Sequence, residues 1–184
     1  GAVLTGINGR GKTSYLQLLP LFYGESPSEI VKVNAGKDSF IDYYLPRTTS
    51  YICFEYSRAD GSMRLVVCYS TGSGEKLNYR LVRTGFDESM FKASDTDLVT
   101  AQNLKAHLKL SGVIFADRQI ETISEYRAII QGAVLPTSDR QRQREIKQLV
   151  QDYSFSQQPL RQIEKIVTGM FRRETNFSDL QSMV

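Results

Sequence analysis

Residues 6–13 read Gly-Ile-Asn-Gly-Arg-Gly-Lys-Thr, and this stretch decides the fold that we expect for the chain. It matches the pattern G-x-x-x-x-G-K-[ST] at every fixed position. An apolar run at residues 2–5 precedes it, and an amphipathic run at residues 12–23 follows it. A strand, a glycine-rich loop and a helix in this order form a P-loop, so the sequence predicts an α/β fold of the P-loop NTPase class.

Each position of the loop has a physical task in holding phosphate. Glycines permit backbone angles that other residues avoid, so that successive N–H groups point at phosphate oxygens, and the following helix adds its positive dipole end. We expect Lys12 to reach the β- and γ-phosphates and Thr13 to ligate magnesium, with ATP and Mg2+ as the bound species. The residues expected to contact the nucleotide are Asn8, Gly9, Arg10, Gly11, Lys12, Thr13 and Ser14.

The clearest β-strand signal lies in the middle of the chain. Three runs are expected to form an antiparallel meander with one buried face: Tyr51–Ser57, Met63–Ser70 and Leu77–Arg83. A two-residue hairpin turn at Asp60-Gly61 would set the register of the first pair. That register places Cys53 directly opposite Cys68, as two reduced thiols in a sheet or, alternatively, as a redox switch.

Helical spacing of apolar residues predicts further elements on both sides of the meander. The expected helices span residues 38–45, 97–110, 139–153 and 159–173. The last helix carries an apolar stripe that packs on the domain or leads toward a coiled-coil arm, formed by Leu160, Ile163, Ile166, Val167 and Met170. We expect one unit over residues 1–184, with the P-loop strand and helix at 1–24, the meander at 50–84 and C-terminal helices at 137–184.

The composition indicates an ordinary globular domain. The 184 residues are 41% hydrophobic and 23% charged, with a formal net charge of +3. No apolar run approaches bilayer length and no signal-peptide pattern opens the chain. We therefore expect a cytoplasmic protein with no membrane partner, and this location is compatible with association with the nucleoid. The small net charge does not by itself indicate a nucleic-acid partner.

Residues 8–13 resemble the N-G-x-G-K-[ST] form of ABC-type ATPases, including the SMC group. The meander after the P-loop helix resembles the ABC β-subdomain. Residues 129–134, Ile-Ile-Gln-Gly-Ala-Val, resemble the Q-loop of SMC heads, where a strand ends in Gln-Gly. The sequence from residue 11 to residue 25 is similar to the heads of MukB-like condensin ATPases of the Wadjet plasmid-defence type.

This resemblance implies the N-terminal lobe of an ABC/SMC-type ATPase head, whose C-terminal half lies beyond a long coiled-coil arm. It implies that Gln131 takes a catalytic role by touching the magnesium ion and the attacking water. It also implies ATP hydrolysis coupled to head dimerisation in a condensin-like, DNA-handling complex, with plasmid or phage defence as one setting. The implied partners are the C-terminal half of the same head, a second head sharing an ATP sandwich, DNA and a kleisin-like subunit.

Two motifs that an ABC-type site needs have no convincing match in the sequence. Leu110-Ser111-Gly112 begins like a signature motif, but Val113 breaks it. Residues 113–117, Val-Ile-Phe-Ala-Asp, look like a Walker B strand, but Arg118 stands where the catalytic glutamate belongs. We therefore expect a short core strand here, and little ATP hydrolysis by this chain alone, because positioning and charge stabilisation supply most of the catalysis.

Two alternatives stay open. In the first, the chain is a self-contained P-loop nucleotide switch or kinase in which Asp117 is the Walker B magnesium ligand, which requires a parallel strand at 113–117 beside the P-loop strand. In the second, the chain is a non-catalytic interaction module with a vestigial P-loop, and the intact Lys12 and Thr13 argue against it.

A basic run at residues 139–147 supplies a candidate DNA-binding face. On a helix, Arg140, Arg144 and Lys147 share one side, where they could meet DNA phosphates in salt-sensitive contacts. Charge alone favours a solvated helix surface, whereas the family resemblance favours DNA.

Overall fold

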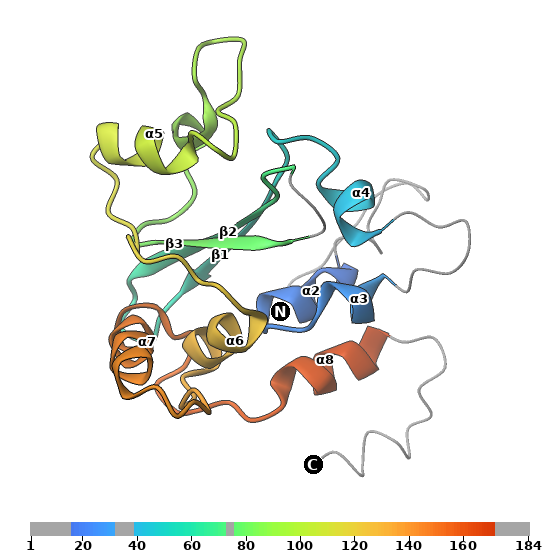
Figure 1. Ribbon diagram of the computed structural model, residues 1–184, viewed down its shortest axis with the longest axis vertical. Coiled ribbons are helices and arrows are strands. Elements are labelled where there is room, and N and C mark those ends of the chain that lie inside the picture. Colours follow the sequence, from blue (N-terminus) through green and yellow to red (C-terminus); the bar gives the residue numbers. More distant parts are fainter. Residues whose placement is uncertain (1–15, 32–38, 73–75, 172–184) are drawn as a thin grey trace.

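The computed structural model describes residues 16–31, 39–72 and 76–171. Within them the chain is a mixed α/β structure, in which a three-stranded antiparallel sheet carries helices on both faces (Figure 1). The elements in chain order are α2 Leu19–Phe22, α3 Pro27–Ile30, α4 Phe40–Tyr44, β1 Tyr51–Ser57, β2 Met63–Tyr69, β3 Asn78–Val82, the 3-10 helix η1 Glu88–Phe91, α5 Leu104–Leu110, α6 Ile123–Gln131, α7 Arg140–Tyr153 and α8 Ile163–Phe171.

The strand expected at residues 2–5, the P-loop at 6–13 and Ser14 all lie outside the described residues. The first described residues, 16 and 17, are helical and lead into α2, within the helix expected at 12–23. None of the described helices is long and apolar enough to span a membrane.

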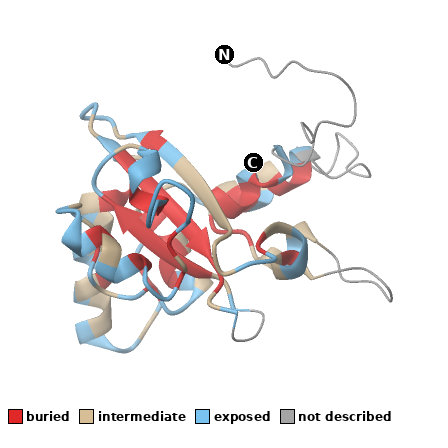
Figure 2. Cartoon of the chain, turned by 90° about the horizontal axis from the view of Figure 1, so that it is seen from above, coloured by how far each residue is buried: buried red, intermediate tan, exposed pale blue. Residues whose placement is uncertain are grey.

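The meander is confirmed, with strand order β1-β2-β3 and antiparallel pairing throughout. The expectation of one buried face is wrong, because residues 64–69 of the central strand are buried on both sides of the sheet (Figure 2). Val66 and Cys68 point to a first core against α2, α6 and α7, whereas Leu65 and Val67 point to a second core against η1 and α5. Each buried valine or leucine contributes about 1.5–3 kcal/mol, so β2 fixes the sheet to both helical layers.

The register of the first hairpin differs from the expected one by one residue. Cys53 pairs with Val67, and Cys68 pairs with Ile52. The reason is a three-residue loop instead of a two-residue turn: Gly61 has a φ of 79° and its N–H donates to the carbonyl of Arg58 at 2.9 Å. Both faces of β2 are apolar, so the hydrophobic pattern could not reveal the shift.

The predicted helices at 38–45 and 139–153 are confirmed as α4 and α7. The helix predicted over 97–110 begins only at Leu104. The residues before it fold back on η1, because the N–H of Ala93 donates to the carbonyl of Asp97 at 2.8 Å and the N–H of Val99 donates to the carbonyl of Phe91 at 2.8 Å. The helix predicted over 159–173 begins at Ile163.

The two cysteines are expected to be inert in the folded chain. The observed register places Cys53 and Cys68 on opposite faces of the sheet, which excludes a disulfide between them without unfolding. Burial raises the pKa of the Cys53 thiol to about 12 and raises the pKa of the Cys68 thiol well above its usual range, so neither forms the reactive thiolate near neutral pH. Iodoacetamide at pH 8 will therefore leave both thiols unmodified in buffer and alkylate both in urea, as read by mass spectrometry. An intramolecular disulfide in the folded chain would contradict this register.

Candidate functional site

Gln131 is the last residue of helix α6, so the expectation that a strand ends in Gln-Gly at this point is wrong. The Thr122 hydroxyl accepts from the N–H of Glu125 at 3.2 Å, and the Glu125 carboxylate accepts from the N–H of Thr122 at 3.3 Å. This capping box starts the helix, and Gly132, with a φ of 68°, ends it. The Thr-x-x-Glu spacing and the following glycine are the sequence signals that favoured a helix here.

The side chain of Gln131 is buried and donates two hydrogen bonds. Its amide nitrogen donates to the carbonyl of Tyr23 at 2.8 Å and to the carboxylate of Glu164 at 2.6 Å. The structure therefore brings this sequence-predicted residue to the turn that directly follows α2. These two hydrogen bonds join protein groups through the amide nitrogen, whereas a cation would bind the amide oxygen. The magnesium role of Gln131 stays a prediction.

Gln131 belongs to a polar cluster that joins the end of α2 to α6 and α8. The other members are buried or half-buried side chains: Glu25, Arg127, Glu164 and Thr168. The Arg127 Nε donates to the carbonyl of Gly24 at 2.9 Å and lies 3.6 Å from the Glu164 carboxylate. The Thr168 hydroxyl lies 3.1 Å from the Glu25 carboxylate. We call these five residues the polar cluster.

Helix α8 is held through its polar side. Glu164 and Thr168 are buried, whereas Met170 is 64% exposed and Ile166 and Val167 are half-buried. None of the apolar side chains of α8 belongs to either of the two cores formed by the described residues. Within the described residues, the expected apolar stripe thus does not join either core, and the helix packs beside α2 (Figure 1). Glu164 and Thr168 are four positions apart, so their side chains lie on the same side of the helix.

Gly24 makes the close approach between α2 and α6 possible. It has a φ of 88°, and a Cβ added to it would lie 2.8 Å from the Cβ of Arg127 and 2.9 Å from its Cα. A side chain at this position would strain the backbone and push Arg127 away. The turn after α2 thus lies so close to α6 that only glycine fits at this position.

Asp117, the residue on which the switch or kinase alternative depends, lies outside the polar cluster. Its side chain is 85% exposed and its Oδ1 lies 2.6 Å from the Nζ of Lys105, whose hydrogen bond lowers the pKa of the Asp117 carboxyl. The preceding segment pairs antiparallel with β3, through Phe115 and Val82. The parallel strand that the alternative requires is therefore not formed with β3, and the P-loop strand beside which it is expected lies outside the described residues.

The basic residues around α7 divide into two groups. Arg142 is turned inward against Glu125 of α6, and Arg118 forms an ion pair with Glu145. The other group, Arg140, Arg144 and Lys147, is exposed, and in the described part of the chain no acidic side chain pairs with it. We call these three residues the α7 basic face.

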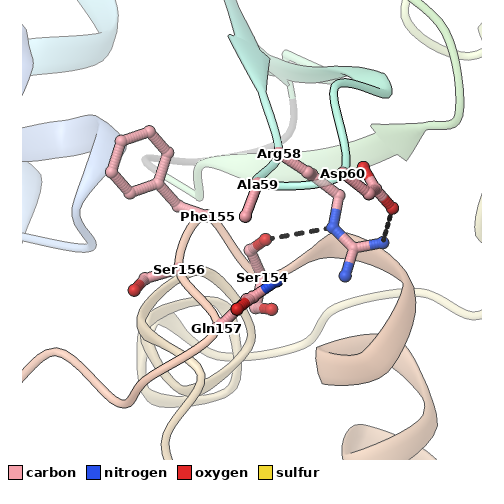
Figure 3. A pocket seen from close by; sticks show the side chains of 7 residues that line it. All are labelled: Arg58, Ala59, Asp60, Ser154, Phe155, Ser156 and Gln157. Carbon is pink, nitrogen blue, oxygen red and sulfur yellow. Dashed lines mark hydrogen bonds and ion pairs between the residues drawn. The ribbon is translucent and has the colours of Figure 1, made fainter.

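A small polar hollow lies where the β1–β2 hairpin meets the end of α7 (Figure 3). Its volume is about 30 Å³. Arg58 lines it, with its Nε donating to the carbonyl of Ser154 at 3.3 Å and its Nη1 lying 3.7 Å from Asp60. A volume of this size holds one or two water molecules and no nucleotide. Among the described residues, no group of three His, Cys, Asp or Glu side chains is placed to hold a metal ion.

A family model described as "Protein of unknown function (DUF3584)" matches residues 1–184, the whole chain. The chain belongs to the DUF3584 family. This family is of unknown function and is found in MukB/SMC-like proteins. No curated protein and no solved structure matches this DUF3584 chain.

Gly24→Ala tests the close approach of α2 and α6 in the DUF3584 chain. The left-handed backbone and the overlap with Arg127 together are expected to destabilise the fold by roughly 2–5 kcal/mol. Gly61→Ala is the matched control, because Gly61 has a φ of 79° and nothing lies within 4 Å of its added Cβ. Gly61→Ala is expected to lower the free energy of unfolding by about 1 kcal/mol. Urea unfolding monitored by circular dichroism measures the loss of stability in both variants. Equal losses in Gly24→Ala and Gly61→Ala would contradict the tight contact at Gly24.

Proposed function

We propose that this chain is the nucleotide-binding lobe of an SMC-like ATPase head of the P-loop NTPase class. The observation that carries the proposal is the P-loop pattern at residues 6–13, complete with Lys12 and Thr13. The membership of a family found in MukB/SMC-like proteins and the antiparallel meander both support the ABC/SMC type over other P-loop classes.

In this proposal the chain binds and orients the triphosphate. Backbone N–H groups of residues 8–14 surround the phosphates, Lys12 balances their negative charge, and Thr13 supplies a hydroxyl to Mg2+. The sequence has no convincing Walker B carboxylate pair and no convincing signature motif. In this proposal the chain therefore contributes binding and charge stabilisation rather than a complete hydrolytic site. The remaining groups come from the C-terminal half of the head and from a second head that shares the ATP, in a DNA-handling complex with a kleisin-like subunit.

The α7 basic face supports DNA as a partner. The neighbouring arginines Arg118 and Arg142 are neutralised by carboxylates of α6 and α7, whereas Arg140, Arg144 and Lys147 keep their charges toward solvent. These three exposed cations share one helix face, and no acidic side chain of the described residues pairs with them. Such a face attracts a phosphate backbone without sequence preference. The occurrence of the family in MukB/SMC-like proteins points the same way.

Lys12→Ala tests the nucleotide site. Removing the cation that faces the β- and γ-phosphates is expected to weaken binding of magnesium ATP roughly 10–100-fold, because hydrogen bonds to charged groups contribute about 1.5–3 kcal/mol. Isothermal titration calorimetry measures the change, with Lys76→Ala as the control for loss of one exposed cation. Equal affinity in wild type and Lys12→Ala would remove the basis of the proposal. Competition between ATP and GTP on wild type tests the choice of nucleotide.

Replacement of the α7 basic face tests the DNA partner. The triple variant Arg140→Gln/Arg144→Gln/Lys147→Gln is expected to weaken binding of a short DNA duplex and to reduce the slope of log affinity against log salt by about 2–3, because each phosphate contact contributes about 0.9 to that slope. Fluorescence anisotropy at several salt concentrations measures both effects. The control variant Arg47→Gln/Lys76→Gln/Lys109→Gln removes the same charge from scattered exposed positions. Equal losses in both variants would show that net charge, and not this face, governs binding.

A further inference from the structure

We infer that the outer edge of strand β1 is a docking site for one extended, largely apolar polypeptide strand that is not part of this 184-residue chain and that carries a basic side chain near Glu55. The inference goes beyond the proposed nucleotide-binding function and does not depend on it. It assigns a partner surface to a part of the sheet that neither the P-loop pattern nor the α7 basic face involves.

The direction of the backbone groups of β1 follows from its hairpin with β2. In an antiparallel pair, alternate residues direct their N–H and C=O groups toward the partner strand. The N–H of Arg58 donates to the carbonyl of Ser62 at 2.9 Å, and alternation from this bond directs residues 52, 54 and 56 to β2. The backbone groups of the remaining four residues point away from the sheet, and we call these the edge residues: Tyr51, Cys53, Glu55 and Ser57.

The opposite edge of the sheet, along β3, follows the same alternation and is covered. The N–H of Arg83 donates to the carbonyl of Ile114 at 2.8 Å, and the N–H of Ala116 donates to the carbonyl of Leu81 at 2.9 Å. Along β1, in contrast, no backbone group of the described residues bonds to the outward groups of the edge residues. In the described part of the chain, the sheet therefore has one paired edge and one open edge.

Both faces of β1 are covered, so that its edge is the part left for a partner. On the α2 side the ring of Phe54 lies 5.6 Å from that of Phe22, and on the α5 side the ring of Tyr51 lies 4.9 Å from that of Phe91. The side chains of residues 51–54 are nevertheless only half-buried, whereas residues 64–69 of β2, which has a strand on each side, are buried. An added strand would bury the β1 side chains further and place its own alternate side chains against the two helical layers.

The edge of β1 lacks the usual protection against strand addition. Edge strands of native proteins commonly carry lysine or proline, or contain a bulge. Residues 51–57 include no lysine and no proline, and they pair with β2 residue for residue without a bulge. The strand is seven residues long, which is enough to hold a partner through main-chain hydrogen bonds.

Glu55 indicates the charge of the partner strand. It is the one charged residue of β1, it is exposed, and its carboxylate accepts from the N–H of Phe86 at 2.6 Å. No cation of the described residues pairs with it. A basic side chain opposite Glu55 is therefore favoured. A second copy of β1 fits less well, because full antiparallel overlap places the two Glu55 side chains diagonally, at about 7–8 Å, where like charges repel.

Residue-resolved hydrogen exchange of the 184-residue chain tests whether the edge is open. The amides of the edge residues are expected to exchange at least about tenfold faster than those of residues 52, 54 and 56, because only the latter donate to β2. The two sets alternate along one strand, so each is the control for the other. Equal protection of both sets would show that the edge is already occupied and would overturn the inference.

A synthetic peptide of sequence VTVKVTV is the probe for the partner strand, because it favours an extended conformation and carries one central lysine. Fluorescence anisotropy of the labelled peptide measures its affinity for the chain. The control peptide VTVEVTV is expected to bind about fivefold more weakly, and this preference is expected to reverse in Glu55→Lys. An unchanged preference in Glu55→Lys would overturn the inference.

The same peptides identify where binding occurs. VTVKVTV is expected to slow the exchange of the edge amides, whereas VTPKPTV, which keeps the charge but lacks two N–H donors, is expected not to bind. Absence of VTVKVTV binding, or binding that leaves the edge amides unchanged, would overturn the inference. Sedimentation that shows a dimer held through the edge residues would identify a second copy as the occupant and would also overturn it. None of these measurements uses nucleotide, so their outcome is separate from that of the proposed function.

Discussion

The double-sided burial of strand β2 is the constraint on which the rest of this structure depends. Val66 and Cys68 anchor the layer formed by α2, α6 and α7, and Leu65 and Val67 anchor the layer formed by η1 and α5. Because α2 and α6 pack on the same face of this strand, their ends meet, and the polar cluster forms where they meet. The position of Gln131 relative to α2 is therefore set by the sheet.

The two helical layers are held to the sheet by different kinds of contact. The layer on the α5 side is closed by apolar packing, and its exposed polar residues, such as Asp117 and Lys105, pair with each other at the surface. The layer on the α6 side combines apolar packing with the polar cluster and with the inward ion pair of Arg142 and Glu125. Hydrogen bonds and ion pairs depend on direction, whereas apolar packing does not. The polar contacts therefore fix the relative orientation of the helices on the α6 side more closely than apolar packing alone would.

The sequence predicted the elements with strong local signals and missed those decided by tertiary context. The meander and α7 follow from alternation and helical spacing, and both are confirmed. The hairpin register was missed because a pattern that is apolar on both faces is compatible with either register. Two sequence signals conflict at α6: the resemblance of residues 129–134 to a motif that ends a strand, and the capping box at Thr122 and Glu125, which predicts the helix that forms. For the candidate site, Gln131 was identified from the sequence, but Glu164 was not, because a buried carboxylate on a helix with an apolar stripe contradicts the usual direction of burial.

The polar attachment of α8 has a consequence for how this part of the chain opens. Within α8, the side chains of Glu164 and Thr168 are buried, whereas those of Ile163, Ile166 and Val167 are only half-buried. The heat-capacity change and the denaturant dependence of an opening reaction both scale with the apolar and total surface that becomes exposed. Local opening of α8 is thus expected to depend on urea concentration less steeply than global unfolding, which also separates β2 from both cores. The two reactions are distinguishable in one experiment by their slopes.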